Sequence, residues 1–385
     1  MGKIALIFRN IRSIHIGKDV TLVPQHLGRV LGLDVEIISN ESKVEHDIPE
    51  YVDGMRFRLL KGIWPDGKTS RSIRLLLFLC RHAKEYDVIV LFHYHMRSLL
   101  GVLTYKIFNP KGVAYIKGDM KPEDIMSGYS RVRGIRGVLR RTFYRIAISR
   151  LDVMSCEAAG VVSLIKSSDS PLLAFREGQL VLAPNGFDEA GMARTGTVRK
   201  SWEEKENIIL TAGRMGYPEK NHEMLLDALR NVDLDGWKCI FAGKRTPEFD
   251  EKVKAFRQDC PDKSDSVIMA GYISDKKSMW DLFNRARVFV LTSRWESAAL
   301  VLNEAKWFGC YILTTDVGVA SDLLSGIPCG EFLPQDDPPA LAEALNRIIS
   351  GKTNTDAYEG YDFSELGIGH CMRPVEERIA MLLKK

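Results

Sequence analysis

The amino-acid sequence predicts an α/β protein made of two Rossmann-like domains that face one another across a cleft. A chain of 385 residues is long enough for two domains of ordinary size. Short aliphatic runs alternate with helical patterns, and this alternation begins again after residue 205. A polar stretch with little hydrophobic periodicity, 191–200, separates the two series and is the predicted linker.

Each series supplies the strands of one parallel sheet. In the first series we expect a helix at about 18–31 and strands at 3–8, 35–38, 88–91 and 113–116. In the second we expect a helix at 222–229 and strands at 208–212, 238–242, 267–270, 288–291 and 311–314. The predicted domains are therefore 1–190 and 201–370, followed by a terminal helix over 371–385 that could pack back on the N-terminal domain.

Composition narrows the class of protein further. The longest apolar run near the N-terminus, 75–80, is far shorter than a membrane span, and the first ten residues lack the features of a secretory signal. The seven cysteines are scattered without a CxxC pair, which indicates neither a zinc site nor a disulfide framework. We expect a cytoplasmic protein without a bound metal.

Positive charge is concentrated in the first half of the chain. Residues 1–190 carry 28 Lys plus Arg against 20 Asp plus Glu, a net +8, whereas residues 191–385 carry 26 against 30, a net −4. The stretch 129–150 contains no acidic residue. On a helical projection its apolar residues gather on one side and its arginines on the remainder: Ile135, Val138, Leu139, Phe143 and Ile146 against Arg133, Arg136, Arg140, Arg141 and Arg145.

This arginine-rich helix has two interpretations. It could lie on the anionic inner face of a membrane, with the arginines toward the lipid headgroups. Alternatively, its apolar side packs on the first sheet and its arginines are simply solvated. A nucleic-acid partner is not expected, because no aromatic residues interleave with the basic ones in a recognised motif.

The second half contains a pattern suited to binding phosphate. The predicted strand 208–212 ends in Gly213 and Arg214, and Lys220 stands just before the next helix. Glycine permits a close turn, and basic residues near a helix N-terminus attract phosphate. The plain alternative is that both basic side chains are solvated charges on a surface loop.

Two glutamates follow a later strand. Glu296 comes after the strand 288–291, and Glu304 lies about two turns into a helix predicted over 298–308. A carboxylate in that position could accept two hydrogen bonds from a ribose diol. The eight-residue spacing by itself is weak evidence, and two surface glutamates on a helix are the alternative.

Taken jointly, these residues make the C-terminal half, about 205–350, resemble glycosyltransferase family 4 of the GT-B fold. The resemblance rests on Gly213-Arg214 with Lys220-Asn221, on Gly271, on Glu296 and Glu304-Ala305, on Gly309 and on Thr315-Asp316-Val317-Gly318. In the N-terminal half, Gly17 occupies the loop after the first strand, where the family keeps glycine.

The resemblance implies a retaining, metal-independent enzyme without a cofactor. It would move a hexose from a nucleoside-diphosphate sugar to a glycan or lipid-linked acceptor in cell-surface polysaccharide biosynthesis. The implied catalytic residues are Arg214, Lys220 and Glu296: the two cations neutralise the diphosphate and Glu296 contacts the transferred sugar. Glu304 binds the ribose in the family. The donor-binding residues carried over are Gly17, Gly213, Arg214, Lys220, Gly271, Tyr272, Glu296, Ala299, Leu300 and Glu304.

The chain departs from the family pattern at three places. Ser297 and Ala298 stand where glycine and an aromatic residue usually follow the first glutamate, and Cys310-Tyr311 stands where Pro-Val is common. The usual histidine after the strand 113–116 is missing, so its role on the acceptor side is open. The candidates for that role are His93, His95, Lys117 and Asp119.

Other functions remain open from the sequence. A nucleotide-sugar epimerase and a glycogen-synthase-like polymerase are alternatives on the same fold. A further alternative is a catalytically silent nucleotide-sugar-binding subunit that supports a partner transferase, as the missing histidine and the altered residues after Glu296 suggest.

Overall fold

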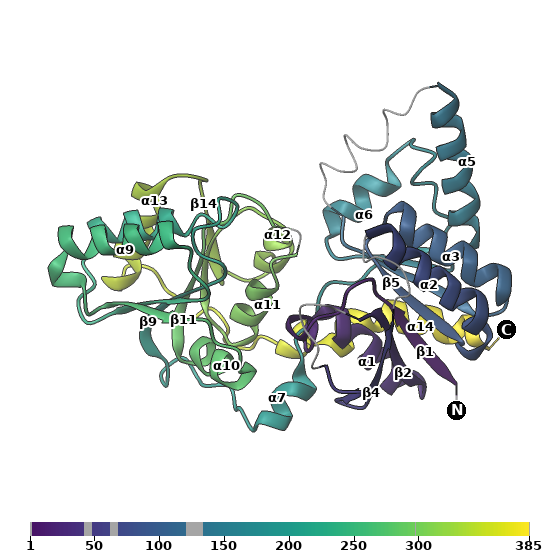
Figure 1. Cartoon of the computed structure of the whole chain (residues 1–385). Coiled ribbons are helices and arrows are strands. Elements are labelled where there is room, and N and C mark those ends of the chain that lie inside the picture. Colours follow the sequence, from purple (N-terminus) through teal and green to yellow (C-terminus); the bar gives the residue numbers. More distant parts are fainter. Residues whose placement is uncertain (1, 42–47, 62–67, 121–133, 297, 385) are drawn as a thin grey trace. The chain divides into compact units, whose positions relative to one another are not determined.

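The computed structural model describes residues 2–41, 48–61, 68–120, 134–296 and 298–384. These residues form two compact units, which Figure 1 shows. Unit 1 comprises Met1–Asp188 and Ile368–Lys385, and unit 2 comprises Glu189–Gly367. The fold is mixed α/β, as predicted, and each unit is built around one sheet.

Unit 1 contains an eight-stranded sheet in the order β3-β4-β2-β1-β5-β6-β7-β8. All neighbouring strands are parallel except β3 and β4, which are antiparallel. The strands are β1 (Lys3–Ile7), β2 (Asp34–Asn40), β3 (Tyr51–Val52), β4 (Met55–Leu60), β5 (Val88–Phe92), β6 (Val113–Gly118), β7 (Val153–Cys156) and β8 (Leu180–Leu182).

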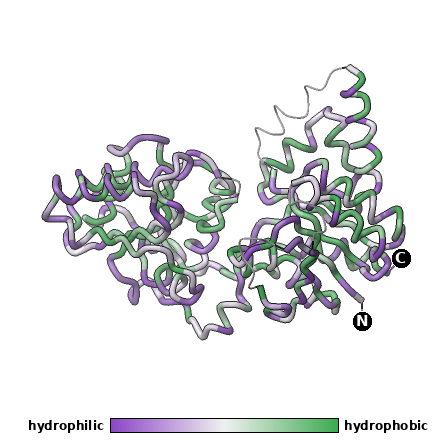
Figure 2. The backbone as a smooth tube through the Cα atoms, viewed as in Figure 1, coloured by the Kyte–Doolittle hydropathy of each residue, from purple (hydrophilic) through white to green (hydrophobic). Residues whose placement is uncertain are grey.

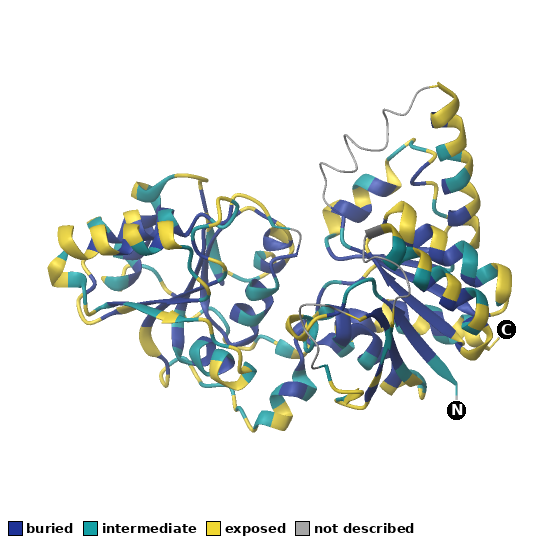
Figure 3. Cartoon of the chain, viewed as in Figure 1, coloured by how far each residue is buried: buried dark blue, intermediate teal, exposed yellow. Residues whose placement is uncertain are grey.

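Helices cover both faces of this sheet, and its central strand β5 is apolar and buried along its whole length (Figures 2 and 3). Successive β1 residues join different cores: Ala5 packs in the core with α2 and α3, and Leu6 in the core with α1 and α14. The helices of unit 1 are α1 (Asp19–Leu31), α2 (Lys68–His82), α3 (Met96–Phe108), α5 (Gly134–Arg150), α6 (Ala159–Lys166) and α14 (Ile368–Leu383).

Unit 2 contains a six-stranded, fully parallel sheet in the order β11-β10-β9-β12-β13-β14. The strands are β9 (Glu206–Ala212), β10 (Lys238–Ala242), β11 (Val267–Gly271), β12 (Ala286–Leu291), β13 (Tyr311–Thr315) and β14 (Gly330–Leu333). The helices are α7 (Glu189–Thr195), α8 (His222–Ala228), α9 (Pro247–Asp259), α10 (Lys276–Arg285), α11 (Leu300–Trp307), α12 (Ala320–Leu324) and α13 (Pro338–Ile349).

In both sheets the first strand of the unit lies in the interior. β9 pairs with β10 on one side and with β12 on the other, and β1 likewise pairs with β2 and with β5. At these two places the strand order reverses, so the loops that follow the two neighbouring strands diverge and leave room for a ligand. The structure therefore offers one candidate binding position in each unit.

Several elements differ from those the sequence predicts. The predicted linker, 191–200, overlaps α7, in which the thioether sulfur of Met192 accepts a hydrogen bond from the Trp307 indole at 3.1 Å. A long-range contact of this kind stabilises a short helix that has little periodicity of its own. Five strands that are short, partly polar or both were not predicted: β3, β4, β7, β8 and β14. The terminal helix α14 begins at Ile368, earlier than expected, and packs in the core of unit 1.

The arginine-rich helix α5 buries a different side from the one that the helical projection favours. Its buried residues are Gly137, Tyr144, Ala147 and Ile148. Of the predicted apolar side, only Phe143 packs against the core, whereas the others are exposed by 49 to 82%: Ile135, Val138, Leu139 and Ile146. The interpretation in which this side packs on the sheet is therefore wrong for those four residues (Figure 3). Arg133 lies outside the described residues.

Within the described part of the chain, no helix combines the length and the apolar character needed to cross a bilayer.

Candidate functional site

The candidate donor site of unit 2 centres on an ion pair between the loops that follow β9 and β12. The Lys220 ammonium lies 2.7 Å from both carboxylate oxygens of Glu296. The Ser293 hydroxyl donates to Glu296 Oε1, also at 2.7 Å. Only 21% of the lysine side chain and 10% of the glutamate side chain are exposed. The sequence predicted these two residues as partners in one site but not their direct contact.

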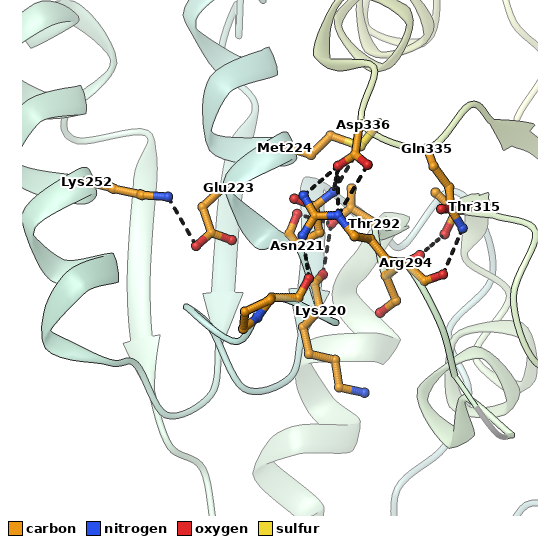
Figure 4. Close-up of polar contacts among 12 residues, drawn as sticks. Lys220, Asn221, Glu223, Met224, Lys252, Thr292, Arg294, Thr315, Gln335 and Asp336 are labelled. Carbon is orange, nitrogen blue, oxygen red and sulfur yellow. Dashed lines mark hydrogen bonds and ion pairs between the residues drawn. The ribbon is translucent and has the colours of Figure 1, made fainter.

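Backbone geometry holds the lysine in this place. Asn221, next to Lys220, has φ of 47° and precedes the first residue of α8. Its carbonyl accepts a hydrogen bond from the Thr292 hydroxyl at 2.8 Å, and its amide group donates to Asp336 at 3.0 Å. Arg294 also donates to Asp336. Figure 4 shows Asp336 at the centre of this cluster, while the Lys220 side chain extends away from it.

Arg214 lies on the loop after β9, with its side chain largely exposed. Its guanidinium is 3.1 Å from the Glu219 carboxylate and 4.4 Å from the centre of the Tyr217 ring, and 57% of its side chain is exposed. The preceding residue, Gly213, is closely surrounded: a Cβ at Gly243 would come within 1.7 Å of its carbonyl oxygen. The two glycines thus let the loops after β9 and β10 touch.

Glu304 lies in α11, a helix that begins slightly later than predicted. Ala299 precedes it with φ of 51°, and Leu300 is its first residue. The Trp280 indole of α10 donates to Glu304 Oε1 at 3.3 Å. This contact orients the carboxylate, which remains partly exposed.

The other predicted donor residues are spread over both units. Gly271 ends β11 with φ of 73°, and Tyr272 after it is 55% exposed, with the Lys244 ammonium 4.7 Å from its ring centre. Gly17 belongs to unit 1, where its N–H donates to the Thr21 hydroxyl at 2.9 Å.

The four acceptor-side candidates all lie in unit 1, at the ends of β5 and β6. His93 has φ of 63° and lies 3.5 Å from the Asp119 carboxylate, whose hydrogen bond raises the pKa of the imidazole. Burial lowers the pKa of His95, which accepts a hydrogen bond from the Ser98 N–H. Lys117, in β6, is fully buried and forms an ion pair with Glu157, the residue that follows β7. Its ammonium is therefore committed to Glu157, and His93 with Asp119 remains the accessible pair.

Both histidines line a cavity of about 310 Å³ in unit 1. Neither this cavity nor the arginines that line it were predicted from the sequence; they are Arg9, Arg12 and Arg97. A signal existed, since Arg9 directly follows the first predicted strand, and ligands of parallel sheets bind at the carboxyl ends of strands.

Other residues that the sequence analysis missed are Glu219, Ser293, Arg294 and Asp336. Glu219 contacts Arg214 and Ser293 contacts Glu296, whereas Asp336, itself bound by Arg294, holds Asn221 next to Lys220. Pattern alone does not reveal these contacts. Across the described residues, no cluster of three or more His, Cys, Asp or Glu side chains has an arrangement suited to a metal ion.

The fold is that of GT-B glycosyltransferases. The lipopolysaccharide outer core galactosyltransferase WaaB is similar over 98% of this chain and 99% of its own, with a TM-score of 0.69 and 14% identity. HepE of Anabaena in complex with UDP is similar over 98% of this chain and all of its own, with a TM-score of 0.66 and 15% identity.

Sequence comparison finds similarity over parts of the chain. Residues 197–361 match the family model "Glycosyl transferases group 1". The amylovoran biosynthesis glycosyltransferase AmsD of Erwinia amylovora is 33% identical over 104 residues, which are 26% of this chain and 27% of that protein. The matched region therefore spans about a quarter of this curated relative.

One prediction concerns His222, which packs against Gly213 at the base of the site. Burial, and then the charge of Lys220, lowers the pKa of His222 to about 3, so the imidazole is neutral in the folded chain. The unfolded chain binds a proton below about pH 6.5 and the folded chain does not. As the pH decreases from 6.5 to about 3, the free energy of unfolding should therefore decrease. This group contributes up to about 1.4 kcal/mol of that loss per pH unit.

The measurement is urea unfolding of the wild type and of His222→Gln at several pH values in this window. Carboxylates titrate in both proteins, so the difference between the two curves isolates the histidine. Parallel curves would contradict the assignment of a neutral, buried imidazole.

Proposed function

We propose that this chain is a retaining, metal-independent glycosyltransferase of family 4, which transfers a hexose from a nucleoside-diphosphate sugar to a glycan or lipid-linked acceptor. The observation that carries the proposal is the position of Lys220 and Glu296. The loops that follow two neighbouring strands bring this cation and this carboxylate together where the strand order of unit 2 reverses. That is the position at which doubly wound sheets bind nucleotides.

The cations would stabilise the charge of the leaving diphosphate. Arg214 is exposed and Lys220 is half-buried, and each could donate hydrogen bonds to phosphate oxygens. Preorganised donors of this kind contribute about 3 to 4 kcal/mol each to a transition state. When Lys220 turns to the diphosphate, Glu296 is free to accept hydrogen bonds from hydroxyls of the sugar. The leaving phosphate would itself take the acceptor proton.

The remaining donor contacts follow from the same geometry. Glu304, oriented by Trp280, would accept hydrogen bonds from the ribose, and Tyr272 lies exposed next to the strand end where a base would pass. Support for this class of donor comes from HepE, which was crystallised with UDP. Support for a role in polysaccharide biosynthesis comes from AmsD and WaaB. Unit 1 would bind the acceptor, and the reaction would take place in the cytoplasm.

The alternative is a silent nucleotide-sugar-binding subunit that supports a partner transferase. The absence of the family histidine after β6 favours it, because Lys117 at the end of that strand is occupied by Glu157. Transfer or donor hydrolysis by the purified chain, lost on Lys220→Ala, would exclude this alternative.

The donor site is tested by thermal unfolding with UDP, ADP and GDP, each compared with its nucleoside. One diphosphate should stabilise the chain more than its nucleoside does, by about 2.7 kcal/mol at a hundred times its dissociation constant. Arg214→Ala and Lys220→Ala should each weaken its binding by about 1.5 to 3 kcal/mol, because each removes a charge-assisted hydrogen bond.

Lys238→Ala is the matched control, since Lys238 is exposed at the opposite, amino end of β10. It should bind the diphosphate as the wild type does. Equal stabilisation by nucleoside and diphosphate, or equal binding by Lys220→Ala and Lys238→Ala, would contradict a diphosphate site at Lys220.

We also propose that α5 attaches the chain to an anionic membrane surface. Three apolar side chains stand exposed near its start, Ile135, Val138 and Leu139, beside Arg136, Arg140 and Arg141. Exposed apolar residues would enter the headgroup region, and the arginines would pair with anionic lipids at about 1 kcal/mol each.

Flotation with phosphatidylglycerol vesicles measures this attachment. The triple variants Ile135→Ser/Val138→Ser/Leu139→Ser and Arg136→Ala/Arg140→Ala/Arg141→Ala should each lose most of the binding, and high salt should weaken the wild type. Val30→Ser/Ile107→Ser removes exposed apolar residues elsewhere in unit 1 and should float normally. Wild-type flotation by both triple variants would refute the proposal.

A further inference from the structure

The cavity in unit 1 lies at a topological position equivalent to that of the donor site in unit 2. Its lining includes Phe8–Asn10 directly after β1, and Phe92 and His93 where β5 ends. β1 and β5 are neighbours at the place where the strand order of this sheet reverses. Residues of α2 and α3 complete the lining. A volume of about 310 Å³ is sufficient for a small organic ligand.

One part of the cavity is apolar. Five leucines line it, three from α2, one from β5 and one from α3: Leu75, Leu76, Leu79, Leu91 and Leu100. Leu100 is 37% exposed and Leu76 is half-buried, so part of this apolar surface is open to a ligand. Such a surface favours a hydrocarbon group over a sugar.

Another part of the cavity is cationic. Arg9, Arg12 and Arg97 line it, and its described lining residues include no Asp or Glu. The Nη1 group of Arg9 is buried and has no hydrogen-bond partner among the described residues. Burial, followed by the charges of Arg97 and Arg71, lowers the pKa of Arg9. A buried donor without an acceptor is unfavourable, so an anion placed here would be stabilised.

We propose that this cavity binds an amphiphilic phosphate, with the phosphate at Arg9 and Arg97 and the adjoining hydrocarbon against the leucines. The inference rests on the proposed function, because it names the class of acceptor that unit 1 would bind: a lipid carrying a phosphate rather than a neutral glycan. Guanidinium groups match phosphate through paired, charge-assisted hydrogen bonds. The leucines account for a preference over free phosphate.

The proposal is tested by titration calorimetry of the full chain with octyl phosphate, inorganic phosphate and octyl glucoside. Octyl phosphate should bind at least about tenfold more tightly than either of the others, because only it fills both parts of the cavity. Equal binding of inorganic phosphate would indicate a plain anion site and overturn the proposal. Equal binding of octyl glucoside would indicate a plain apolar pocket and also overturn it.

Paired variants locate the binding. Arg97→Gln should weaken octyl phosphate by about tenfold, and Arg81→Gln, the same change at an exposed α2 residue outside the lining, should not. Leu76→Gln should weaken octyl phosphate by about fivefold and leave inorganic phosphate unchanged. Leu77→Gln, at the next residue of the same helix but outside the lining, should bind as the wild type does. Equal affinities within either pair would overturn the assignment.

A second comparison separates this proposal from the donor site. Lys220→Ala should retain octyl phosphate binding, because Lys220 belongs to unit 2; loss of binding in this variant would place the phosphate at the donor site and overturn the inference. If the chain binds UDP but does not bind octyl phosphate, the proposed function stands and only the proposed phosphate site in the cavity is contradicted. Octyl phosphate binding by a chain that does not bind UDP would contradict the proposed donor site and support phosphate binding in the cavity of unit 1.

Discussion

The structure depends on one topological constraint: in each unit the first strand lies inside its sheet, between two strands that arrive later in the chain. β9 lies between β10 and β12, and β1 lies between β2 and β5. The loops that leave these strands must therefore turn to opposite faces of the sheet, and space opens between them. Lys220 and Glu296 occupy that space in unit 2, and the arginine-lined cavity occupies it in unit 1.

The Lys220–Glu296 pair shows how unit 2 can hold a cation ready for a ligand. Removing both charges from water has a desolvation cost, which their attraction and the added hydrogen bond from Ser293 offset. The pair also fixes the lysine within reach of the β9 and β12 strand ends. An incoming diphosphate would compete with Glu296 for the ammonium, so phosphate binding and sugar recognition become linked through a single side chain.

Much of unit 2 is predictable from the sequence, because its strands and site residues are indicated by patterns of neighbouring residues along the chain. Strands flanked on both faces by helices contain buried runs rich in apolar residues, as β9 and β12 do. Gly213-Arg214 directly follows β9, and Lys220 and Glu296 lie on the loops after β9 and β12. Contacts between residues that are far apart in the chain cannot be predicted from such local patterns. The short helix α7 is supported by a hydrogen bond from Trp307 to Met192, which are far apart in the sequence.

On α5 the projected apolar side is mostly exposed, because the small and aromatic residues Gly137, Tyr144 and Ala147 face the core instead. Lys117 is a further case, because its ion pair with Glu157, the residue that follows β7, is not evident from the sequence.

Donor binding, as proposed, separates Lys220 from Glu296 so that the ammonium binds the diphosphate instead. A crystal structure with the nucleoside-diphosphate sugar that stabilises the chain most tests it directly. We expect phosphate oxygens within about 3 Å of the Lys220 ammonium and the Glu296 carboxylate turned to hydroxyls of the sugar. A diphosphate bound elsewhere, with the Lys220–Glu296 ion pair unchanged, would contradict it.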